Sequence, residues 1–278
     1  MPIAHPVPLI DPIRKYVLFT NGKCGGTTIK SWFLSNIDFY QAVSNPFYSA
    51  KRFGLLFAIG GYLKYFNSRL QVKEMTNADL RDSINFYRSA YSKRNAKARY
   101  SLDYKKIIIT RDPFKRVVSG FVDKFCGEDR NEAWVAGVVE SHGNNGDFSF
   151  SDFVNYLCNV KEELHDPHWR RQTFIIDGVD VDYFLKLENI EEDFRSVSHV
   201  VGEEFSDYFA VKRQGNIYKD DASWKSNEVP YLSQNEIMSL AEKAGSFPGH
   251  SCFLNEELKV KIRKVYEKDF TRFTYYDK

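Results

Sequence analysis

Cysteine is scarce in this sequence, and neither sign of charge is in clear excess. Four of the 278 residues are cysteines, and 39 Lys and Arg stand against 37 Asp and Glu, which gives a net charge of +2. The cysteines, at positions 24, 126, 158 and 252, show no CxxC spacing, so we expect no metal site. The small net charge, without a dense basic run among aromatic residues, predicts no nucleic-acid partner. A Cys126–Cys158 disulfide is compatible with the sequence, but reduced thiols are the simpler expectation.

Long hydrophobic runs are also absent. The longest apolar run, residues 53–63, is well short of the about 20 residues that a membrane-spanning helix needs. The start of the chain is rich in proline and lacks the apolar centre of a secretory signal. We therefore expect no transmembrane segment and a cytoplasmic location. Residues 53–63 are expected to form a buried helix, and the alternative is contact with a lipid-like ligand or a membrane surface.

Apolar and aromatic residues are plentiful. Hydrophobic residues make up 43% of the chain and aromatic residues 16%, which is ample for a core in a chain of this length. Many aromatic residues fall between positions 47 and 66. Most of them are expected in the core, and the alternative is a wall that faces a sugar or a lipid. We find no repeat and no low-complexity linker, so we expect a single domain over residues 1–278.

The spacing of apolar residues predicts an α/β fold. Short apolar segments alternate with amphipathic ones, so the strands should form a mostly parallel central sheet flanked by helices, with ligands at the carboxyl ends of the strands. The expected strands are residues 15–20, 105–110 and 183–187. The expected helices are residues 27–37, 113–126, 151–160, 189–200, 234–244 and 256–268, with a helical insertion through 50–98 and a loop over 127–148.

A strand, a glycine turn and the start of a helix follow one another at residues 15–33. The turn contains one lysine, two glycines and two hydroxyl side chains: Lys23, Cys24, Gly25, Gly26, Thr27 and Thr28. Glycines let the backbone approach a ligand, and the amide groups of the first helical turn attract negative charge. The turn therefore suits a phosphate-like anion, although a structural role is about equally compatible with this stretch alone.

The order of these residues separates the turn from the P-loop of nucleoside triphosphatases, in which the lysine stands late in the loop. Here Lys23 comes first. The order Lys-x-Gly-Gly-Thr-Thr after a strand resembles the 5′-phosphosulfate loop of sulfotransferases that use 3′-phosphoadenosine-5′-phosphosulfate (PAPS). The resemblance implies that residues 23–28 bind this donor. It also implies that Lys23 is catalytic, because it would stabilise charge on the leaving nucleotide.

A second junction of strand and helix, at residues 105–125, has the donors that a terminal phosphate needs. Arg111 leaves the strand and Ser119 lies two helical turns further on. A guanidinium and a hydroxyl together suit a phosphate monoester. The order Arg-Asp-Pro-x-x-Arg-x-x-Ser resembles the 3′-phosphate site of the same sulfotransferases, which implies that Arg111 and Ser119 bind the donor. We expect Asp112 to cap the helix and Arg116 to have a structural role.

Further along the chain follow residues 148–157, then Asp166-Pro-His-Trp-Arg-Arg-Gln172, then residues 183–189 and a closing segment over residues 254–275. In this order they resemble one branch of these enzymes, the carbohydrate-type sulfotransferase family that includes the Golgi chondroitin and dermatan enzymes. The resemblance covers residues 14–35, 104–125, 147–195 and 253–276. It implies a P-loop-like three-layer fold, and it adds the soluble part of a Golgi-type enzyme as the alternative to a cytoplasmic protein. Cys24 departs from the family, which usually has a small hydroxylated residue there. Residues 36–103 show no such resemblance, and we expect this helical insertion to shape the acceptor site.

Sulfuryl transfer to a hydroxyl also needs a base, and a side chain that titrates near neutral pH is the first candidate. Among the six histidines, His168 occupies the family's recurrent His-Trp position, and we predict that it is the catalytic base. An acidic base is the alternative. His142 and His165 are outside candidates, whereas His250 is expected to have a surface or capping role. Glu188 is expected to be structural.

Two basic stretches leave alternatives open. Arg170, Arg171 and Gln172 either contact an anionic acceptor or belong to a solvated loop. Residues 212–225 form a basic loop that either closes over the nucleotide or is an ordinary surface loop.

The expected activity is therefore PAPS-dependent sulfuryl transfer to a hydroxyl of a carbohydrate or glycoconjugate, with no metal. A kinase-like phosphotransferase is the first alternative. The lysine-first turn and the lack of a Mg²⁺-binding carboxylate motif after an apolar strand disfavour it. A catalytically inactive module that binds a nucleotide or a glycan is the second alternative. The sequence leaves the oligomeric state open.

Overall fold

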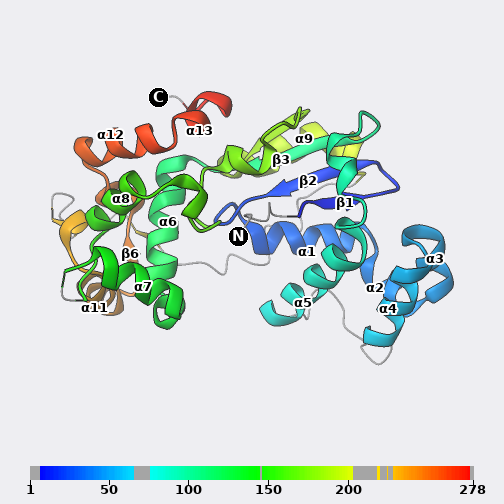
Figure 1. The fold of residues 1–278 in the computed structure, drawn as a ribbon, viewed down its shortest axis with the longest axis horizontal. Coiled ribbons are helices and arrows are strands. Elements are labelled where there is room, and N and C mark those ends of the chain that lie inside the picture. Colours follow the sequence, from blue (N-terminus) through cyan, green and yellow to red (C-terminus); the bar gives the residue numbers. More distant parts are fainter. Residues whose placement is uncertain are drawn as a thin grey trace. The chain divides into compact units, whose positions relative to one another are not determined.

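The computed structural model describes residues 7–65, 76–144, 146–202, 218–219, 224 and 228–275. Contacts divide the chain into two compact units: unit 1 comprises Met1–Thr110 and Phe174–Arg213, and unit 2 comprises Arg111–Thr173 and Gln214–Lys278. Figure 1 shows the elements of both, and each unit is described by itself. Unit 1 contains the turn at residues 23–28, and unit 2 contains Arg111, Ser119 and His168. The single domain over residues 1–278 stays a prediction.

Unit 1 is built on a four-stranded sheet with the strand order β1-β2-β3-β4. β1 pairs antiparallel with β2, while β2, β3 and β4 run parallel, with Thr20 beside Ile109 and Thr110 beside Lys186. The carboxyl ends of the three parallel strands therefore lie at one edge of the sheet. The strands are β1 (Leu9–Asp11), β2 (Tyr16–Thr20), β3 (Lys105–Thr110) and β4 (Tyr183–Lys186). The structure confirms the mostly parallel sheet and adds β1, which the sequence analysis missed.

Different segments cover the two faces of this sheet. On one face, α1 (Gly26–Asn36) sets the Phe33 ring edge-on against Tyr16 of β2, with ring centroids 6.2 Å apart. Phe19 lies three positions further along β2 and therefore faces the opposite side. There the guanidinium of Arg99, from the 3₁₀ helix η3 (Ala96–Tyr100), lies 5.8 Å from the Phe19 ring centroid. α9 (Ile190–Val201) packs beside α1, since the rings of Trp32 and Phe194 meet at 4.9 Å.

The insertion between α1 and β3 is helical, as the sequence predicts. Phe39, Phe53, Phe57, Phe86 and Tyr87 meet in it in a continuous set of ring contacts. Phe53 and Phe57 are buried, whereas Phe47 is exposed; Phe66 lies outside the described residues. The elements are α2 (Phe39–Ser44), α3 (Pro46–Phe53), α4 (Leu55–Tyr65), α5 (Asn77–Tyr87) and the π-helix η2 (Arg88–Ser92). Of the six described aromatic residues at positions 47–66, three are core (Phe53, Phe57 and Tyr65), two are half-buried and Phe47 is exposed.

Unit 2 packs helices around a phenylalanine-rich core. The ring of Phe121, in α6, contacts those of Phe125, Phe150, Phe153 and Phe253. The main elements are α6 (Pro113–Phe125), η4 (Glu128–Asn131), α7 (Ala133–His142), α8 (Phe150–Asn159), α11 (Gln234–Ala244), α12 (Glu256–Val265) and α13 (Glu267–Arg272), with a short sheet of β5 (Tyr218–Lys219) and β6 (Phe247–Pro248). The cysteines at positions 24, 126, 158 and 252 are all free, so the Cys126–Cys158 disulfide is not formed.

Two sequence predictions for unit 2 are wrong in detail. Residues 127–148 are not a loop, because α7 lies within them and turns Val135, Val138 and Val139 toward the core. The helix expected over 256–268 is broken at Tyr266, whose ring is buried and whose hydroxyl donates to the carbonyl of Trp169. The break fits this contact, because Tyr266 leaves α12 at the point where its hydroxyl reaches the 166–170 segment.

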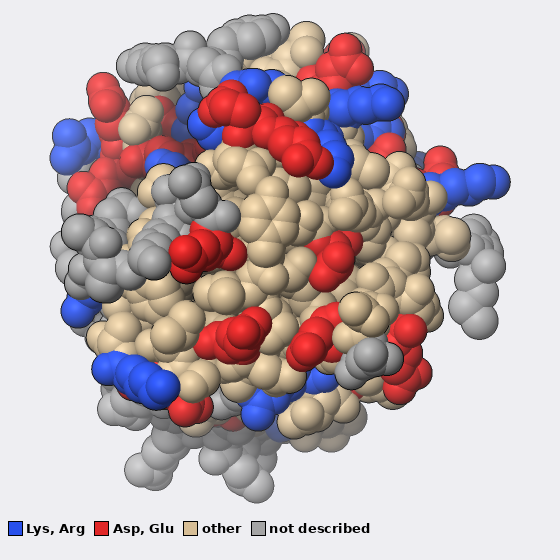
Figure 2. Space-filling model, turned by 90° about the vertical axis from the view of Figure 1, so that its left-hand side faces the viewer, with Lys and Arg blue, Asp and Glu red and all other residues tan. Residues whose placement is uncertain are grey.

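The outer surface of unit 2 has charges of both signs. Figure 2 looks at the side of the molecule where α7, α8, α11 and α12 are labelled in Figure 1, and red and blue side chains are scattered there among uncharged ones. On α12, Lys259 pairs with Glu256 at 2.8 Å and Lys261 with Glu257 at 2.7 Å. Exposed pairs of this kind contribute little to stability, so the buried aromatic core is what stabilises this unit. Among the described residues, none of the helices is both long and apolar enough to cross a bilayer.

Candidate functional site

The turn after β2 presents backbone N–H groups at the start of α1. Gly25 is the N-cap of this helix, and α1 has neither a side-chain cap nor an acidic residue in its first turn. The first N–H groups of a helix have no partner within it, and the helix dipole adds partial positive charge at this end. Lys23 supplies a full positive charge in the same turn. These groups together can bind an anion.

The backbone of this turn has two left-handed residues, Lys23 with φ 65° and Gly25 with φ 69°. A left-handed conformation is uncommon for lysine and easy for glycine. A Cβ at Gly25 would also stand 2.8 Å from Cδ1 of Leu187, which is too close. Glycine is therefore needed at position 25 for both its conformation and its lack of a side chain.

We expect Gly25→Ala to lower the free energy of unfolding by about 1–2 kcal/mol from the left-handed conformation alone, with a further loss from the contact with Leu187. Urea unfolding measures this. Gly60→Ala in α4 is the matched control, because a Cβ there would meet the Phe86 ring at an ordinary 3.5 Å and alanine favours a helix. Unchanged stability of Gly25→Ala would contradict the argument.

Cys24 does not offer its side chain to a ligand. The residue is buried, and its thiol lies 3.7 Å from the carbonyl oxygen of Gly22. A donor contact from Cys24 therefore has to come from its backbone N–H. Thr27 is exposed and Thr28 is half-buried at the start of α1. The exposure of Cys24, Thr27 and Thr28 does not test whether residues 23–28 bind a ligand, so this role stays a prediction.

Two partly buried cations, Lys30 and Arg88, lie beside the same turn, and the sequence analysis did not single them out. Nζ of Lys30 lies 3.8 Å from the point where a Cβ on Gly26 would stand. Nη2 of Arg88 lies 3.5 Å from Oγ1 of Thr20, the last residue of β2. Nε of Arg88 is buried and has no hydrogen-bond partner among the described residues. Lys30 stands one helical turn after Gly26, a spacing visible in the sequence, whereas only the fold brings Arg88 here from the insertion.

Both cations are largely shielded from water, and neither forms a salt bridge within the described ranges. Burial, and then the charge of Arg88, lower the pKa of Lys30 to about 8, and burial lowers the pKa of Arg88 to about 10. Buried cations of this kind are stabilised when an anion binds next to them. The β2–α1 turn therefore fits a multiply charged anionic ligand.

In unit 2, a buried amide holds the backbone of Arg111, which precedes α6. Oε1 of Gln172 accepts from the Arg111 N–H at 2.8 Å, and Nε2 of Gln172 donates to the Arg111 carbonyl, also at 2.8 Å. Asp269 of α13 is buried and accepts from the backbone N–H of Gln172 at 2.6 Å and of Thr173 at 2.8 Å. The sequence analysis missed this support, since Gln172 and Asp269 lie far from Arg111 in the chain.

The side chain of Arg111 meets a histidine that was expected to have a surface or capping role. Nη2 of Arg111 lies 3.2 Å from Nε2 of His250, and the His250 ring stacks on Tyr218 with centroids 4.2 Å apart. Because arginine only donates, Nε2 of His250 accepts and its ring proton is on Nδ1. His250 therefore orients the guanidinium.

Asp112 caps α6 as predicted, since its Oδ1 accepts from the backbone N–H of Lys115 at 2.9 Å. Ser119 is half-buried on this helix.

His168 is paired with a carboxylate in the turn between α8 and η6 (Gln172–Ile176). Oδ1 of Asp166 lies 2.5 Å from Nδ1 of His168 and 2.9 Å from its backbone nitrogen. Burial acts to raise the pKa of Asp166, but the hydrogen bonds from His168 outweigh it, so this pKa lies below its usual value of 3.8. Asp166 is therefore ionised at neutral pH and orients the imidazole. The His168 side chain is 36% exposed, which leaves Nε2 available as a base.

The turn that carries His168 is fixed to α6 through its carbonyl groups. Arg116 donates from Nη1 to the carbonyl of Arg170 at 2.8 Å and from Nη2 to that of Pro167 at 3.1 Å. A Cβ at Gly120 would lie 3.8 Å from the His168 carbonyl oxygen, so the turn packs closely on the helix. Arg116 is structural, as expected, and it ties α6 to this turn.

Comparisons with known proteins decide the family. The sequence profile described as "Sulfotransferase family" matches residues 10–276. The chain belongs to the sulfotransferase family. It is similar to carbohydrate sulfotransferase 10 of Xenopus laevis, with 27% identity over 55% of this chain and 48% of the relative. It is also similar to carbohydrate sulfotransferase 10 of Gallus gallus (36% identity, 38% of this chain, 34% of the relative) and carbohydrate sulfotransferase 12 of Mus musculus (30% identity, 32% and 26%).

The chain spans about half the length of the first of these relatives, and a smaller share of the other two. No solved structure matched it. The family match confirms the resemblance that rested on the glycine turn and on the Arg-Asp-Pro stretch. The family match also agrees with the mixed α/β fold of the structure and with its mostly parallel sheet.

The remaining candidates of the sequence analysis have structural contacts in this chain. Arg170 is buried and donates from Nε to the His165 carbonyl at 3.0 Å, and Nε of Arg171 pairs with Glu162. His165 is buried, which lowers its pKa, and its Nε2 lies 3.1 Å from the Val160 carbonyl. Most of the basic loop at residues 212–225 lies outside the described residues.

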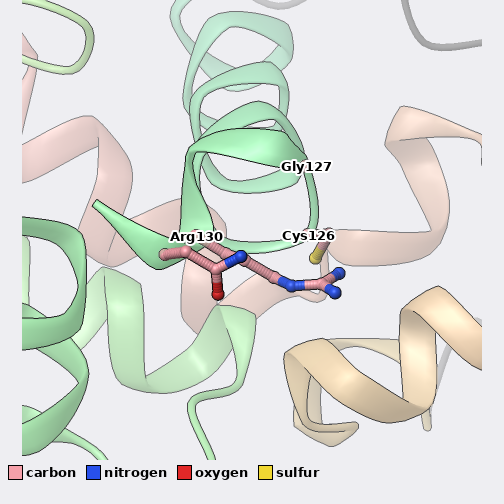
Figure 3. Close-up of a pocket in the computed structure, with 4 residues that line it drawn as sticks. Cys126, Gly127 and Arg130 are labelled. Carbon is pink, nitrogen blue, oxygen red and sulfur yellow. The ribbon is translucent and has the colours of Figure 1, made fainter.

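A cavity of about 410 Å³ in unit 2 lies apart from the predicted site residues of that unit. It is lined by Cys126, Gly127, Arg130 and Asn131, and Figure 3 shows the Arg130 side chain extending toward the Cys126 thiol. Arg111 precedes α6 and Cys126 follows it, so this helix, about 20 Å long, separates them. Burial raises the pKa of the Cys126 thiol, so the thiol stays protonated and unreactive.

Within the described ranges, no three His, Cys, Asp or Glu side chains group as metal ligands.

Proposed function

We propose that this protein is an enzyme that transfers the sulfuryl group of PAPS to a hydroxyl of a carbohydrate or glycoconjugate. The observation that carries the proposal is the β2–α1 turn, where N–H groups, Lys23 and the two partly buried cations favour an anion. The names of the relatives support a carbohydrate acceptor. The P-loop-like three-layer arrangement is part of the same proposal.

Each site residue has a distinct proposed role. Residues 23–28, with Lys30 and Arg88, hold the 5′-phosphosulfate, while Arg111 and Ser119 hold the 3′-phosphate. When bound, PAPS supplies the sulfuryl group. Lys23 stabilises the negative charge that develops on the leaving nucleotide, and His168, oriented by Asp166, removes the proton of the acceptor hydroxyl. No metal is assigned a role, and the insertion at about 36–103 is proposed to shape the acceptor site.

Calorimetric titration with adenosine 3′,5′-bisphosphate, beside 5′-AMP and ATP with and without Mg²⁺, tests the donor assignment. Tight binding of the bisphosphate without metal, and weak binding of 5′-AMP, is expected. A preference for ATP with Mg²⁺ would indicate a phosphotransferase. If the bisphosphate binds and no acceptor in a carbohydrate panel is sulfated, the inactive nucleotide-binding module is the better description.

Arg111→Ala should weaken binding of the bisphosphate about tenfold to a hundredfold, because a charged hydrogen-bonding group is worth about 1.5–3 kcal/mol. Binding of 5′-AMP, which lacks the 3′-phosphate, should not change. Calorimetry measures both affinities. Arg130→Ala is a control in the same unit, since Arg130 contacts the sulfur of Met238. Equal losses for the two nucleotides would contradict the 3′-phosphate role.

Binding of the bisphosphate should be coupled to proton uptake by Lys30. With a folded-state pKa of about 8, about half of the Lys30 side chains are neutral at pH 8, and an anion raises this pKa. Up to about half a proton is then taken up per nucleotide, and affinity weakens as the pH rises above 8. Calorimetry in buffers of different ionisation enthalpy measures the uptake. Lys30→Met should abolish it, and uptake that persists in this variant would exclude Lys30.

The cellular location is not settled by the relatives. The comparisons give no support to the cytoplasmic location that the sequence predicts, and the soluble part of a Golgi-type enzyme stands as the alternative. The carbohydrate acceptor is the only partner that we propose for the enzymatic reaction.

A further inference from the structure

Helix α4 is apolar on two opposite sides. Its inner side, which includes Phe57 and Tyr65, is buried in the aromatic cluster of unit 1. Its outer side contains four large aliphatic residues that are between 50% and 77% exposed. These residues are Leu55, Leu56, Ile59 and Leu63, and with Phe47 of the neighbouring α3, which is 88% exposed, we call them the α3–α4 apolar face.

The spacing of the four aliphatic residues puts them in a single stripe. At 100° per residue, positions 55, 56, 59 and 63 fall within an arc of about 100°, opposite the buried positions. A surface helix normally turns polar side chains outward, as α12 does with its paired Lys and Glu. A continuous exposed apolar stripe of this size is typical of a surface that meets another apolar phase.

The segment that carries this face has charged residues of positive sign only. From Phe39 to Tyr65 the sequence has no Asp or Glu and three basic residues: Lys51, Arg52 and Lys64. Arg52 pairs with Asp38 at 3.0 Å. Lys51 and Lys64 are exposed and form no salt bridge within the part of the chain that the structure describes. Lys51 stands one helical turn after Phe47, so its side chain borders the apolar residues. The Lys64 ammonium lies 5.4 Å from the ring centroid of Tyr65 and 5.8 Å from that of Phe86, at the flank of α4.

We propose that the α3–α4 apolar face docks unit 1 on the surface of an anionic lipid bilayer. With 11 residues, α4 is about 16 Å long, which is too short to cross the membrane but suits a helix that lies in the interface. The aliphatic side chains enter the acyl boundary, and the flexible lysine stems keep their ammonium groups among the phosphate headgroups. A second copy of the chain would bring like charges together at this face. A neutral glycan would leave the leucines in water.

Sedimentation with vesicles tests the proposal without any reference to sulfuryl transfer, so its failure is distinguishable from failure of the proposed function. The intact protein is mixed with vesicles of equal parts phosphatidylcholine and phosphatidylserine, or of phosphatidylcholine alone. We expect binding to the anionic vesicles that weakens at high salt, because screening removes the lysine contribution. The double variant Leu56→Glu/Leu63→Glu should reduce partitioning at least about tenfold, since it removes two apolar anchors.

Leu102→Glu is the matched control, because Leu102 is a 94% exposed leucine of unit 1 outside this face. It should bind vesicles like the wild type, and circular dichroism verifies that all variants are folded. Failure of the wild type to bind anionic vesicles would overturn the proposal, as would equal losses from the control and the double variant. A dimer in size-exclusion chromatography that Leu63→Glu dissociates, without vesicle binding, would instead assign the face to self-association.

Discussion

Replacing Lys23 with alanine should lower turnover about a hundredfold to a thousandfold while adenosine 3′,5′-bisphosphate still binds. The donor groups that face a developing negative charge typically contribute this much to a rate. The N–H groups at the start of α1, Lys30 and Arg88 remain in the variant, so ground-state binding should fall much less. Steady-state kinetics with PAPS, compared with calorimetric binding of the bisphosphate, separates the two effects.

The left-handed backbone of Lys23 makes alanine a suitable replacement. Alanine at φ 65° carries a similar conformational cost to lysine, so a change in activity would not arise from relief of strain. Lys93→Ala is the matched control, since Lys93 is an exposed lysine of the same unit. Parallel losses of turnover and of bisphosphate affinity in Lys23→Ala would make Lys23 a binding residue without a specific role in the transition state.

The parallel strands and the two predicted turns follow closely from the sequence. Three consecutive isoleucines at 107–109 are typical of a strand buried on both faces, and the strand predicted over residues 105–110 has these bounds in the structure. β1 was missed because three residues, Leu9–Asp11, are too short to show a period. α7 was missed because Gly137 and several valines weaken its helix propensity, although Val135, Val138 and Val139 have helical spacing.

The site residues that could be predicted are those whose chemical groups stand close together in the sequence. Lys23, Gly25 and Arg111 belong to local motifs, so their place at strand ends could be predicted before any contact was known. Arg88 and Asp269 could not, because long-range packing alone brings Arg88 to Thr20 and Asp269 to Gln172. A sequence pattern records the spacing within one segment, whereas burial of a charge depends on segments that are distant in the chain.

Replacing His168 with alanine should lower turnover about a hundredfold to ten-thousandfold, which is the usual contribution of a positioned general base. Affinity for the bisphosphate should not change, because the base acts on the acceptor. Asp166→Asn should lower turnover less, since the ring keeps a hydrogen-bonding partner but loses the carboxylate that stabilises its protonated form. Turnover with saturating PAPS, measured across a pH series for all three proteins, gives these values.

Addition of imidazole distinguishes a base from a residue that only shapes the turn. The turn is held by Arg116 and Tyr266 through its carbonyl groups, so loss of the His168 ring should leave it folded with space for a small base. Imidazole should then restore part of the activity of His168→Ala. His142→Ala is the control, because this exposed histidine of the same unit contacts only α7 and the Tyr156 ring in the described structure. Normal turnover of His168→Ala would remove His168 as the base and leave an acidic side chain as the alternative.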